Sequence, residues 1–295
     1  MTGSDESLLR IGLPKGSLQN STIDLFDRAG YHVSVRDRSY FPRIDDPEMT
    51  AVLFRAQEMS RYVEDGVLDI GITGHDWVIE NESEVHEVCE LTYSKATSKP
   101  ASWVLAVPEE SDVKSPQDLA GGIISTELVN TTRNYFSKLG VEVKKVEFSW
   151  GATEVKARLV DAIVDITETG SSLRANNLRV IDTILTSTTR LIANKQSWND
   201  EAKRHKIEDL ALLLRGAIAA RAKVGVKLNV SNDKLDQVLA LLPAERSPTV
   251  NALAEDGWVA VEVIVEEKVE RELVPKLSRA GATGIITYPL NKIIA

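Results

Sequence analysis

The sequence predicts an α/β fold, and three observations along the chain support this class. Residues 8–13 form an apolar strand, which a glycine turn and an amphipathic helix follow. The same order of strand, turn and helix recurs from residue 102 to residue 166. Residues 224–288 then follow the order β-α-β-β-α-β, which is typical of a ferredoxin-like module. We therefore expect α/β lobes followed by a smaller ferredoxin-like domain.

The first third of the chain supplies the first set of elements. The helix after the first strand carries its apolar residues three and four positions apart, and Gly30 ends it. Two strands at 31–35 and 51–55 flank a polar loop with two prolines. We then expect a helix at 60–65, a strand at 67–72 and a helix at 75–80. The helix positions that share the first apolar face are Leu18, Thr22, Leu25, Phe26 and Ala29.

Small and polar residues at 95–101 predict a hinge into a second lobe. That lobe is expected to contain strands at 102–107, 122–125, 143–147 and 161–166, with helices at 129–139 and 152–160. Two further strands, 179–185 and 190–193, are expected to return the chain to the first lobe.

A long helix at 199–222 leads into the C-terminal module, since its apolar residues line one side. The module is expected to have strands at 224–230, 249–254, 258–265 and 284–288, and helices at 232–242 and 267–280. Pro275 lies inside the last helix, where the missing N–H and the bulky ring predict a kink.

Composition excludes several classes of protein. The net charge of −9 over 295 residues argues against nucleic-acid binding. No apolar run approaches the roughly 20 residues that span a bilayer, so we expect no membrane partner. Cys89 is the single cysteine, and the polar first residues do not form a signal peptide. These features predict a cytoplasmic protein.

The segment 161–173 carries the most functional information. An apolar strand with two acids, Asp161 and Asp165, runs into a loop of small hydroxyl residues that opens a helix near Ser171. Backbone N–H groups at a helix start lack partners, and glycine lets a phosphate approach the backbone. A ribose 5-phosphate fits this layout, with its hydroxyls on a carboxylate. From the residues alone, an ordinary strand, turn and helix cap remains equally open.

This segment resembles the phosphoribosyl-diphosphate loop of the ATP phosphoribosyltransferase family. Four other segments match the family in the same order: 13–17, 69–74, 151–154, and 247–250 with 281–282. The resemblance spans nearly the whole chain and includes the C-terminal extension of the long form. It implies a two-lobed clamshell like periplasmic binding proteins, with an ACT-like regulatory domain. We expect lobe I at 1–100 with 185–222, lobe II at 101–184 and the regulatory domain at 223–295.

The resemblance also implies the reaction. The family transfers phosphoribosyl from 5-phosphoribosyl 1-diphosphate to N1 of ATP, releasing diphosphate, as the first step of histidine biosynthesis. It implies Mg²⁺ held mainly through the substrate, and Lys15, Asp161 and Asp165 as catalytic residues. The residues implied for phosphoribosyl diphosphate are Thr167, Glu168, Thr169, Gly170, Ser171 and Ser172. Those implied for the nucleotide are Gly16, Arg55, Asp69, Gly71, Thr73, Gly74 and Glu154.

Regulation is the last implication of the resemblance. Long-form members are inhibited by histidine, and we expect it to contact Asn229, Ser247, Thr249 and Gly284. The resemblance further implies homodimers that assemble into homohexamers. Two alternatives stay open: a prephenate dehydratase, which also joins a clamshell to an ACT-like module, and a non-catalytic amino-acid sensor.

Overall fold

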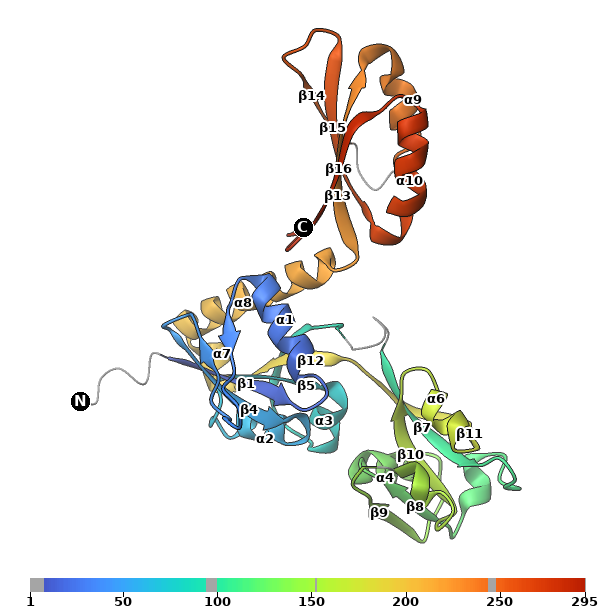
Figure 1. Cartoon of the computed structure of the whole chain (residues 1–295). Coiled ribbons are helices and arrows are strands. Elements are labelled where there is room, and N and C mark those ends of the chain that lie inside the picture. The colour runs from blue at the N-terminus through green and yellow to red at the C-terminus, as the bar shows by residue number, and fades with distance from the viewer. Residues whose placement is uncertain (1–7, 94–99, 152, 244–247, 295) are drawn as a thin grey trace, which may run out of the picture. The chain divides into compact units, whose positions relative to one another are not determined.

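The computed structural model describes residues 8–93, 100–151, 153–243 and 248–294. The chain forms two compact units (Figure 1). One comprises Met1–Asp27 with Tyr31–Ala211, and the other comprises Arg28–Gly30 with Leu212–Ala295. Among the described residues, none of the helices combines the length and the apolar character needed to cross a lipid bilayer.

The first unit contains two five-stranded sheets. In the first sheet, β4, β1 and β5 run parallel, and β12 pairs antiparallel with both β5 and β6. In order across the sheet, the strands are β4 (Met49–Arg55), β1 (Leu9–Lys15), β5 (Ile70–Gly74), β12 (Thr189–Ala193) and β6 (His86–Glu90). A separate two-stranded ribbon consists of β2 (Val33–Ser34) and β3 (Arg43–Ile44).

Helix α2 packs against this sheet because two strand glycines leave room for it. A Cβ atom at Gly12 would lie 2.2 Å from the Met59 sulfur, and one at Gly71 would lie 2.8 Å from Met59 Cγ. Met59 and Val63 are fully buried at this contact. The helices that follow strands of this sheet are α1 (Gln19–Ala29), α2 (Ala56–Glu64), α3 (His75–Glu80), α7 (Lys195–Asn199) and α8 (Glu201–Ala220).

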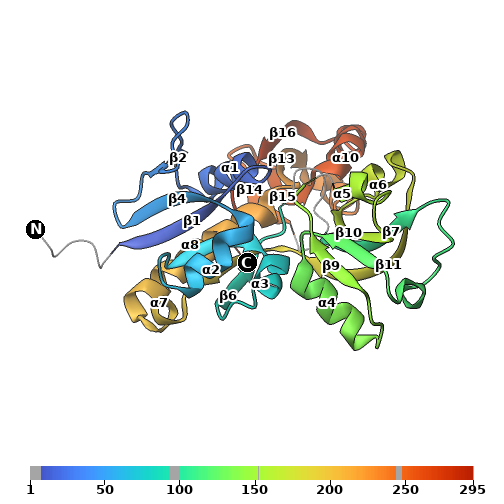
Figure 2. The same ribbon diagram turned by 90° about the horizontal axis from the view of Figure 1, so that it is seen from below.

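The second sheet buries both of its faces. Leu105 and Ala106 are consecutive in β7, so their side chains point to opposite faces, and they belong to different apolar clusters. Phe136 of α4 packs on one face and Leu173 of α6 on the other. The two helices lie on opposite sides of this sheet (Figure 2). In sheet order the strands are β11 (Leu178–Ser187), β7 (Ala101–Pro108), β10 (Ala162–Thr167), β8 (Ile123–Thr126) and β9 (Lys145–Phe148). The helices are η1 (Pro116–Leu119), α4 (Val129–Lys138), α5 (Thr153–Lys156) and α6 (Ser171–Ala175).

The chain passes between the two sheets twice, once between β6 and β7 and once between β11 and β12. This confirms the expected two-lobed α/β arrangement. Only β12 returns to the first sheet, because β11 pairs with β7 up to Ser187. The expected hinge at 95–101 lies mostly outside the described residues.

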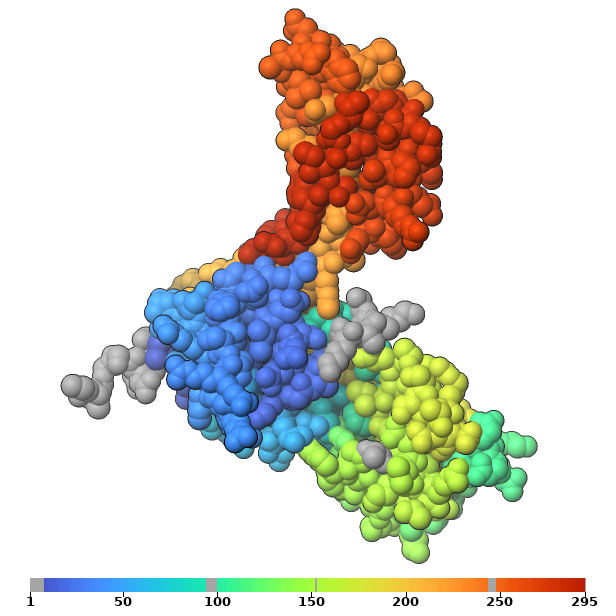
Figure 3. Space-filling view, in the orientation of Figure 1, coloured from blue at the N-terminus to red at the C-terminus, as the bar shows by residue number. Residues whose placement is uncertain are grey.

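The C-terminal unit is an antiparallel sheet with its helices on one side (Figure 1). Val226, Leu228 and Val230 of β13 meet Val238 and Leu277 of the helices in its core. Figure 3 shows the surface that this part of the chain forms, in orange to red. Its elements are β13 (Lys223–Ser231), η2 (Asn232–Lys234), α9 (Leu235–Leu239), β14 (Thr249–Ala252), β15 (Trp258–Glu266), α10 (Glu267–Arg279) and β16 (Thr283–Pro289).

Several expected boundaries were wrong. The helix expected at 152–160 is the single turn α5, and the strand expected at 67–72 begins only at Ile70. The helix expected at 60–65 begins at Ala56, directly after β4. Helix α10 continues across Pro275 to Arg279, because a proline costs the helix one N–H donor while its other hydrogen bonds remain.

Candidate active site

A cleft of about 350 Å³ lies within the first unit, and residues from both sheets line it. The ends of β1, β4 and β5 contribute Lys15, Arg55 and Gly74. The second sheet contributes Glu127 and Glu168. Ligands of α/β proteins commonly bind at the carboxyl ends of parallel strands, and this cleft lies there.

The loop at 167–172 follows β10 at the edge of this cleft. Gly170 has φ +71°, a left-handed conformation that glycine adopts readily. Its N–H donates to Thr167 Oγ1 at 2.7 Å, and Thr169 Oγ1 donates to Ser171 Oγ at 3.0 Å. Helix α6, which the loop opens, has only five residues. Its dipole is therefore small, so an anion at this loop would depend on the amides and hydroxyls of the loop and on nearby cations.

Arg174 supplies such a cation. Its Nη2 donates to the Thr169 carbonyl at 3.0 Å, and its Nη1 lies 2.7 Å from where a Cβ of Gly170 would be. The guanidinium thus folds back over the loop from the next turn of the chain. Arg174 was not among the residues predicted from the sequence, although its position four residues after the loop glycine was a visible signal.

Asp165 lies in β10, two residues before the loop begins at Thr167, and other carboxylates are close to it. Burial is the main cause that raises the pKa of Asp165 to about 6; the charges of Glu154 and Glu127 also raise this pKa, and the hydrogen bond from Ile166 N–H lowers it. Glu154 also accepts a hydrogen bond from the Ser172 hydroxyl, which ties α5 to the loop. The structure therefore brings Asp165, Glu154 and the loop together.

The structure does not bring Asp161 to this group. Asp161 precedes the first residue of β10, and Thr167 is its last, so about 20 Å of extended strand separates them. Asp161 Oδ2 accepts the Ile123 N–H at 2.7 Å. This contact joins the start of β10 to β8, at the opposite end of the strand from the loop.

Lys15 and Arg55 end neighbouring parallel strands, where they pair in register. Lys15 Nζ lies 3.4 Å from the centre of the Tyr40 ring, a cation–π contact. Gly16 follows with φ +104° and open space around its Cα. These three residues line the cleft, as expected from the family resemblance.

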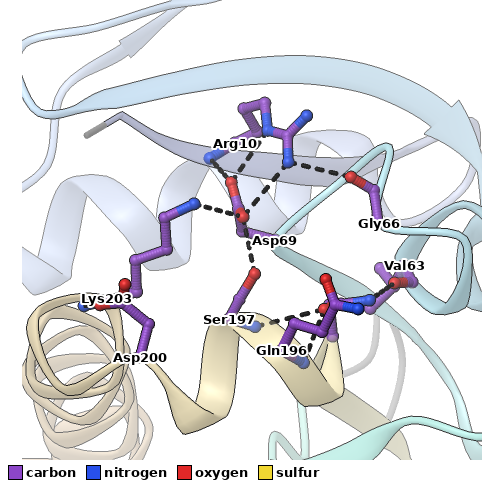
Figure 4. A network of polar contacts seen from close by, with 9 residues as sticks. Arg10, Val63, Gly66, Asp69, Gln196, Ser197, Asp200 and Lys203 are labelled. Carbon is purple, nitrogen blue, oxygen red and sulfur yellow. Dashed lines mark hydrogen bonds and ion pairs between the residues drawn. The ribbon is translucent and has the colours of Figure 1, made fainter. Parts of the chain in front are cut away.

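Asp69 has a different position, at the other end of β5. It is 1% exposed and accepts hydrogen bonds from Arg10 Nε at 3.0 Å, Ser197 Oγ at 2.7 Å and Lys203 Nζ at 2.8 Å (Figure 4). Burial alone would raise its pKa, but these donors outweigh burial and hold the pKa at about 2. Its oxygens are occupied within the fold, away from the cleft.

The other residues of the motif at 69–74 lie partly inside the fold and partly at the cleft. Gly71 makes room for Met59 and Val63, and the fully buried Thr73 donates to the Ala56 carbonyl at 2.7 Å. Gly74 lines the cleft at the start of α3. Of this motif, therefore, only Gly74 lies where a nucleotide could touch it.

Comparison with known proteins shows to which family this chain belongs. The ATP phosphoribosyltransferase family model matches residues 55–216, and the model of its C-terminal domain matches residues 220–292. The ATP phosphoribosyltransferase of Pelodictyon phaeoclathratiforme is 60% identical over 292 residues, which is 99% of each chain. The chain belongs to the ATP phosphoribosyltransferase family.

Other members of the family agree with this assignment. The enzyme of Solibacter usitatus is 57% identical over 97% of this chain and 99% of its own. A solved ATP phosphoribosyltransferase complex from Thermotoga maritima superposes with a TM-score of 0.60 at 25% identity, over 70% of this chain and 99% of that chain. The expected clamshell and C-terminal domain are confirmed. The family catalyses the first step of histidine biosynthesis, so a prephenate dehydratase and a non-catalytic sensor are not favoured.

In the C-terminal domain, two of the four residues expected to bind free histidine lie close together. Gly284 has φ +55°, and a Cβ there would lie 3.3 Å from Asn229 Nδ2. Thr249 lies two strands away from Asn229, paired with Glu262. Ser247 lies outside the described residues.

Three cleft residues of this phosphoribosyltransferase were missed in the sequence. Asp76 is 3% exposed, and its Oδ2 accepts the Trp103 Nε1–H of the second sheet at 2.6 Å. Burial raises its pKa despite that hydrogen bond. Glu127 lines the cleft and accepts the Gly151 N–H at 3.0 Å. These contacts join segments far apart in the sequence, so no local sequence pattern predicts them.

Proposed function

We propose that this chain transfers the phosphoribosyl group of 5-phosphoribosyl 1-diphosphate to N1 of ATP, with the loop 167–172 as the phosphate site. The observation that carries the proposal is the loop itself: a left-handed glycine, flanking hydroxyls and the Arg174 guanidinium at the end of a strand beside the cleft. Guanidinium groups and backbone amides both bind phosphate well.

The chemistry explains why carboxylates stand next to this loop. The bond between C1 and the diphosphate oxygen breaks with its electron pair leaving on diphosphate, and adenine N1 forms the new bond to C1. Positive charge develops on the ribose ring during this exchange. We propose that Asp165 accepts hydrogen bonds from the ribose hydroxyls and, with Glu154, stabilises the ring charge. No protein nucleophile is needed, because N1 attacks directly.

The cationic side of the cleft is proposed to hold the nucleotide. Lys15, Arg55 and Gly74 line it, so phosphates can meet two positive charges and an open glycine turn. Asp69, Gly71, Thr73 and Asp161 are proposed as structural residues instead, because their contacts lie inside the fold.

Magnesium fits this site only through the substrate. The described residues contain no group of three or more His, Cys, Asp or Glu side chains that could hold a metal ion. Mg²⁺ commonly binds through substrate phosphates with one or two carboxylates. Glu127 and Glu168 line the cleft and could meet the waters of such an ion. When bound, the ion would neutralise charge on the diphosphate.

We propose histidine as the inhibitor, bound beside Asn229 and Gly284 in the C-terminal domain. Assembly into dimers and hexamers and a cytoplasmic location belong to the same proposal, and full-length similarity to the family supports them. For the domains, the pairing of β11 with β7 supports moving the end of lobe II from residue 184 to residue 187. Lobe I would then comprise 1–100 with 188–222, and the regulatory domain would remain 223–295.

Ultraviolet absorbance tests the activity. Mixing ATP, 5-phosphoribosyl 1-diphosphate, Mg²⁺ and the full chain should change the adenine spectrum as N1 is alkylated. The change should require both substrates, and Asp165→Asn should slow it at least a hundredfold. An unchanged spectrum with the folded wild-type protein would refute the proposed reaction.

Histidine titration tests the regulatory proposal in the same assay. Gly284→Val, whose side chain would meet Asn229, should lose inhibition and keep turnover. Thr287→Ala, an exposed residue of the same strand, is the matched control. Full inhibition of the Gly284 variant would show that histidine binds elsewhere.

A further inference from the structure

Trp150 is an exposed aromatic residue that contacts Arg55, one of the residues that line the cleft. It follows β9, and 54% of its surface is accessible to solvent. Single exposed apolar residues are common on proteins and need no function by themselves. Two further observations set this one apart.

The first observation is that the backbone on both sides of Trp150 is held in place. Ser149 is 2% exposed, and its N–H donates to the Thr126 carbonyl at 2.8 Å. Gly151, with φ +56°, donates its N–H to Glu127 Oε1 at 3.0 Å. The neighbours of Trp150 are thus anchored to the strand end of β8, while its indole ring is partly exposed, with the Phe148 ring centre 6.0 Å away.

The second observation is what faces the indole ring. The guanidinium carbon of Arg55 lies 5.3 Å from the ring centre. Arg55 ends a strand of the first sheet and lines the cleft, as Glu127 does from the second sheet. An aromatic face that meets a guanidinium can also meet the face of a heteroaromatic base. The separation is too short for a base to lie between the two groups, since two stacked layers need about 7 Å.

We propose that Trp150 is a substrate-recognition residue: its indole face stacks on the adenine base, and Arg55 leaves the ring to pair with the nucleotide phosphates. The inference rests on the proposed function, since it assumes that a nucleotide enters this cleft. It adds a base-recognition residue that the chemistry of the loop does not require. It also assigns Arg55 and Trp150 to the two ends of one ligand.

Equilibrium binding of ligands to the full-length protein tests the base and the phosphates of the nucleotide separately. We expect Trp150→Leu to weaken ATP binding about tenfold or more, and Trp150→Phe to retain most of the affinity. Inorganic tripolyphosphate has no base, so its binding should be unchanged in Trp150→Leu and weakened in Arg55→Ala. Phe41→Leu is a matched control, because Phe41 is 73% exposed on the other lobe. Binding of 5-phosphoribosyl 1-diphosphate should not change in either Trp150 variant.

Two results would overturn the inference. One is that Trp150→Leu binds ATP as tightly as the wild type does. The other is that this variant loses affinity equally for ATP and for tripolyphosphate, which would indicate a general structural effect. Circular dichroism of the leucine variant confirms its fold, and the phenylalanine variant provides the same comparison with an aromatic ring. The proposed reaction can fail separately from this inference. If the wild-type protein bound ATP through Trp150 but showed no turnover, that result would refute the reaction and leave the role of Trp150 intact.

Discussion

Glu80, the last residue of α3, accepts hydrogen bonds from both the backbone N–H and the hydroxyl of Thr131, each at 2.9 Å. Its other oxygen accepts the Asn130 N–H at 2.9 Å. Both Asn130 and Thr131, which supply these three donors, lie in the first turn of α4, which packs on the second sheet. A carboxylate of the first lobe therefore caps a helix of the second, and it is 7% exposed.

Removing this cap should destabilise the protein. Glu80→Ala leaves three donors of α4 without a partner, so the free energy of unfolding should fall by about 1–3 kcal/mol. Calorimetry of the full chain should show a lower melting temperature. Glu82→Gln removes the same charge from an exposed side chain two residues away and should melt like the wild type. Equal melting of both variants would show that the cap contributes nothing.

The Asp69 network should make stability depend on pH in strong acid. Its pKa is about 2 in the folded protein and ordinarily 3.8, so the ionised form is favoured by folding. That contribution, about 2 kcal/mol, is fully present above pH 4 and is lost as the pH falls from about 4 to about 2. Urea unfolding at pH 7 and pH 3 measures it.

Asp69→Asn is the matching variant. It should lower stability at pH 7 by about 3 kcal/mol or more, because Arg10 and Lys203 lose their buried partner. It should also flatten the loss of stability between pH 4 and pH 2. A KM for ATP that rises in a well-folded Asp69→Asn protein would contradict the structural role given to this residue.

Asp165 should have the opposite effect on stability. Its pKa is raised to about 6, so folding disfavours its ionised form and stability falls as the pH rises from about 4 to about 6. Asp165→Asn should therefore be more stable than the wild type at pH 8, by on the order of 1 kcal/mol after allowance for solvent screening. Its turnover should be severely reduced, and wild-type kcat/KM should rise with pH near 6.

Asp161→Asn is the control for Asp165, since it lies at the other end of the same strand. It should lower stability by at most about 1 kcal/mol, because an amide oxygen accepts the Ile123 N–H more weakly than a carboxylate does, and it should leave turnover near the wild-type value. If both asparagine variants lost turnover equally, the sugar site would have to extend along β10.

Arg174 should matter for one substrate only. Arg174→Ala should raise KM for 5-phosphoribosyl 1-diphosphate about tenfold, the effect of losing one charge-assisted bond, and leave KM for ATP unchanged. Arg174→Lys should recover part of the loss. Arg158→Ala, an exposed arginine of the same lobe, should change neither constant. Equal increases for both substrates would argue that Arg174 maintains the fold of the loop.

Much of this protein follows from local pattern. The strand, turn and helix units, the ferredoxin-like order of the C-terminal domain and the loop 167–172 were all predicted, because each depends on residues close together in the chain. The motif at 69–74 shows the limit. A glycine there can mean contact with a ligand or contact with a neighbouring helix, and Gly71 contacts Met59 while Gly74 lines the cleft.

The sequence by itself determined the fold class and the family and predicted a phosphate-binding loop at 167–172, since these depend on periodicity and on contiguous motifs. The tertiary structure decided which acids share that loop. Asp165 and Glu154 do, whereas Asp161 and Asp69 are held by partners elsewhere. It also decided that Arg55 faces Trp150 and that Glu80 caps α4. The reason is physical: these residues meet only after strands and helices that are far apart in the chain have packed together, and no spacing along the chain encodes those distances.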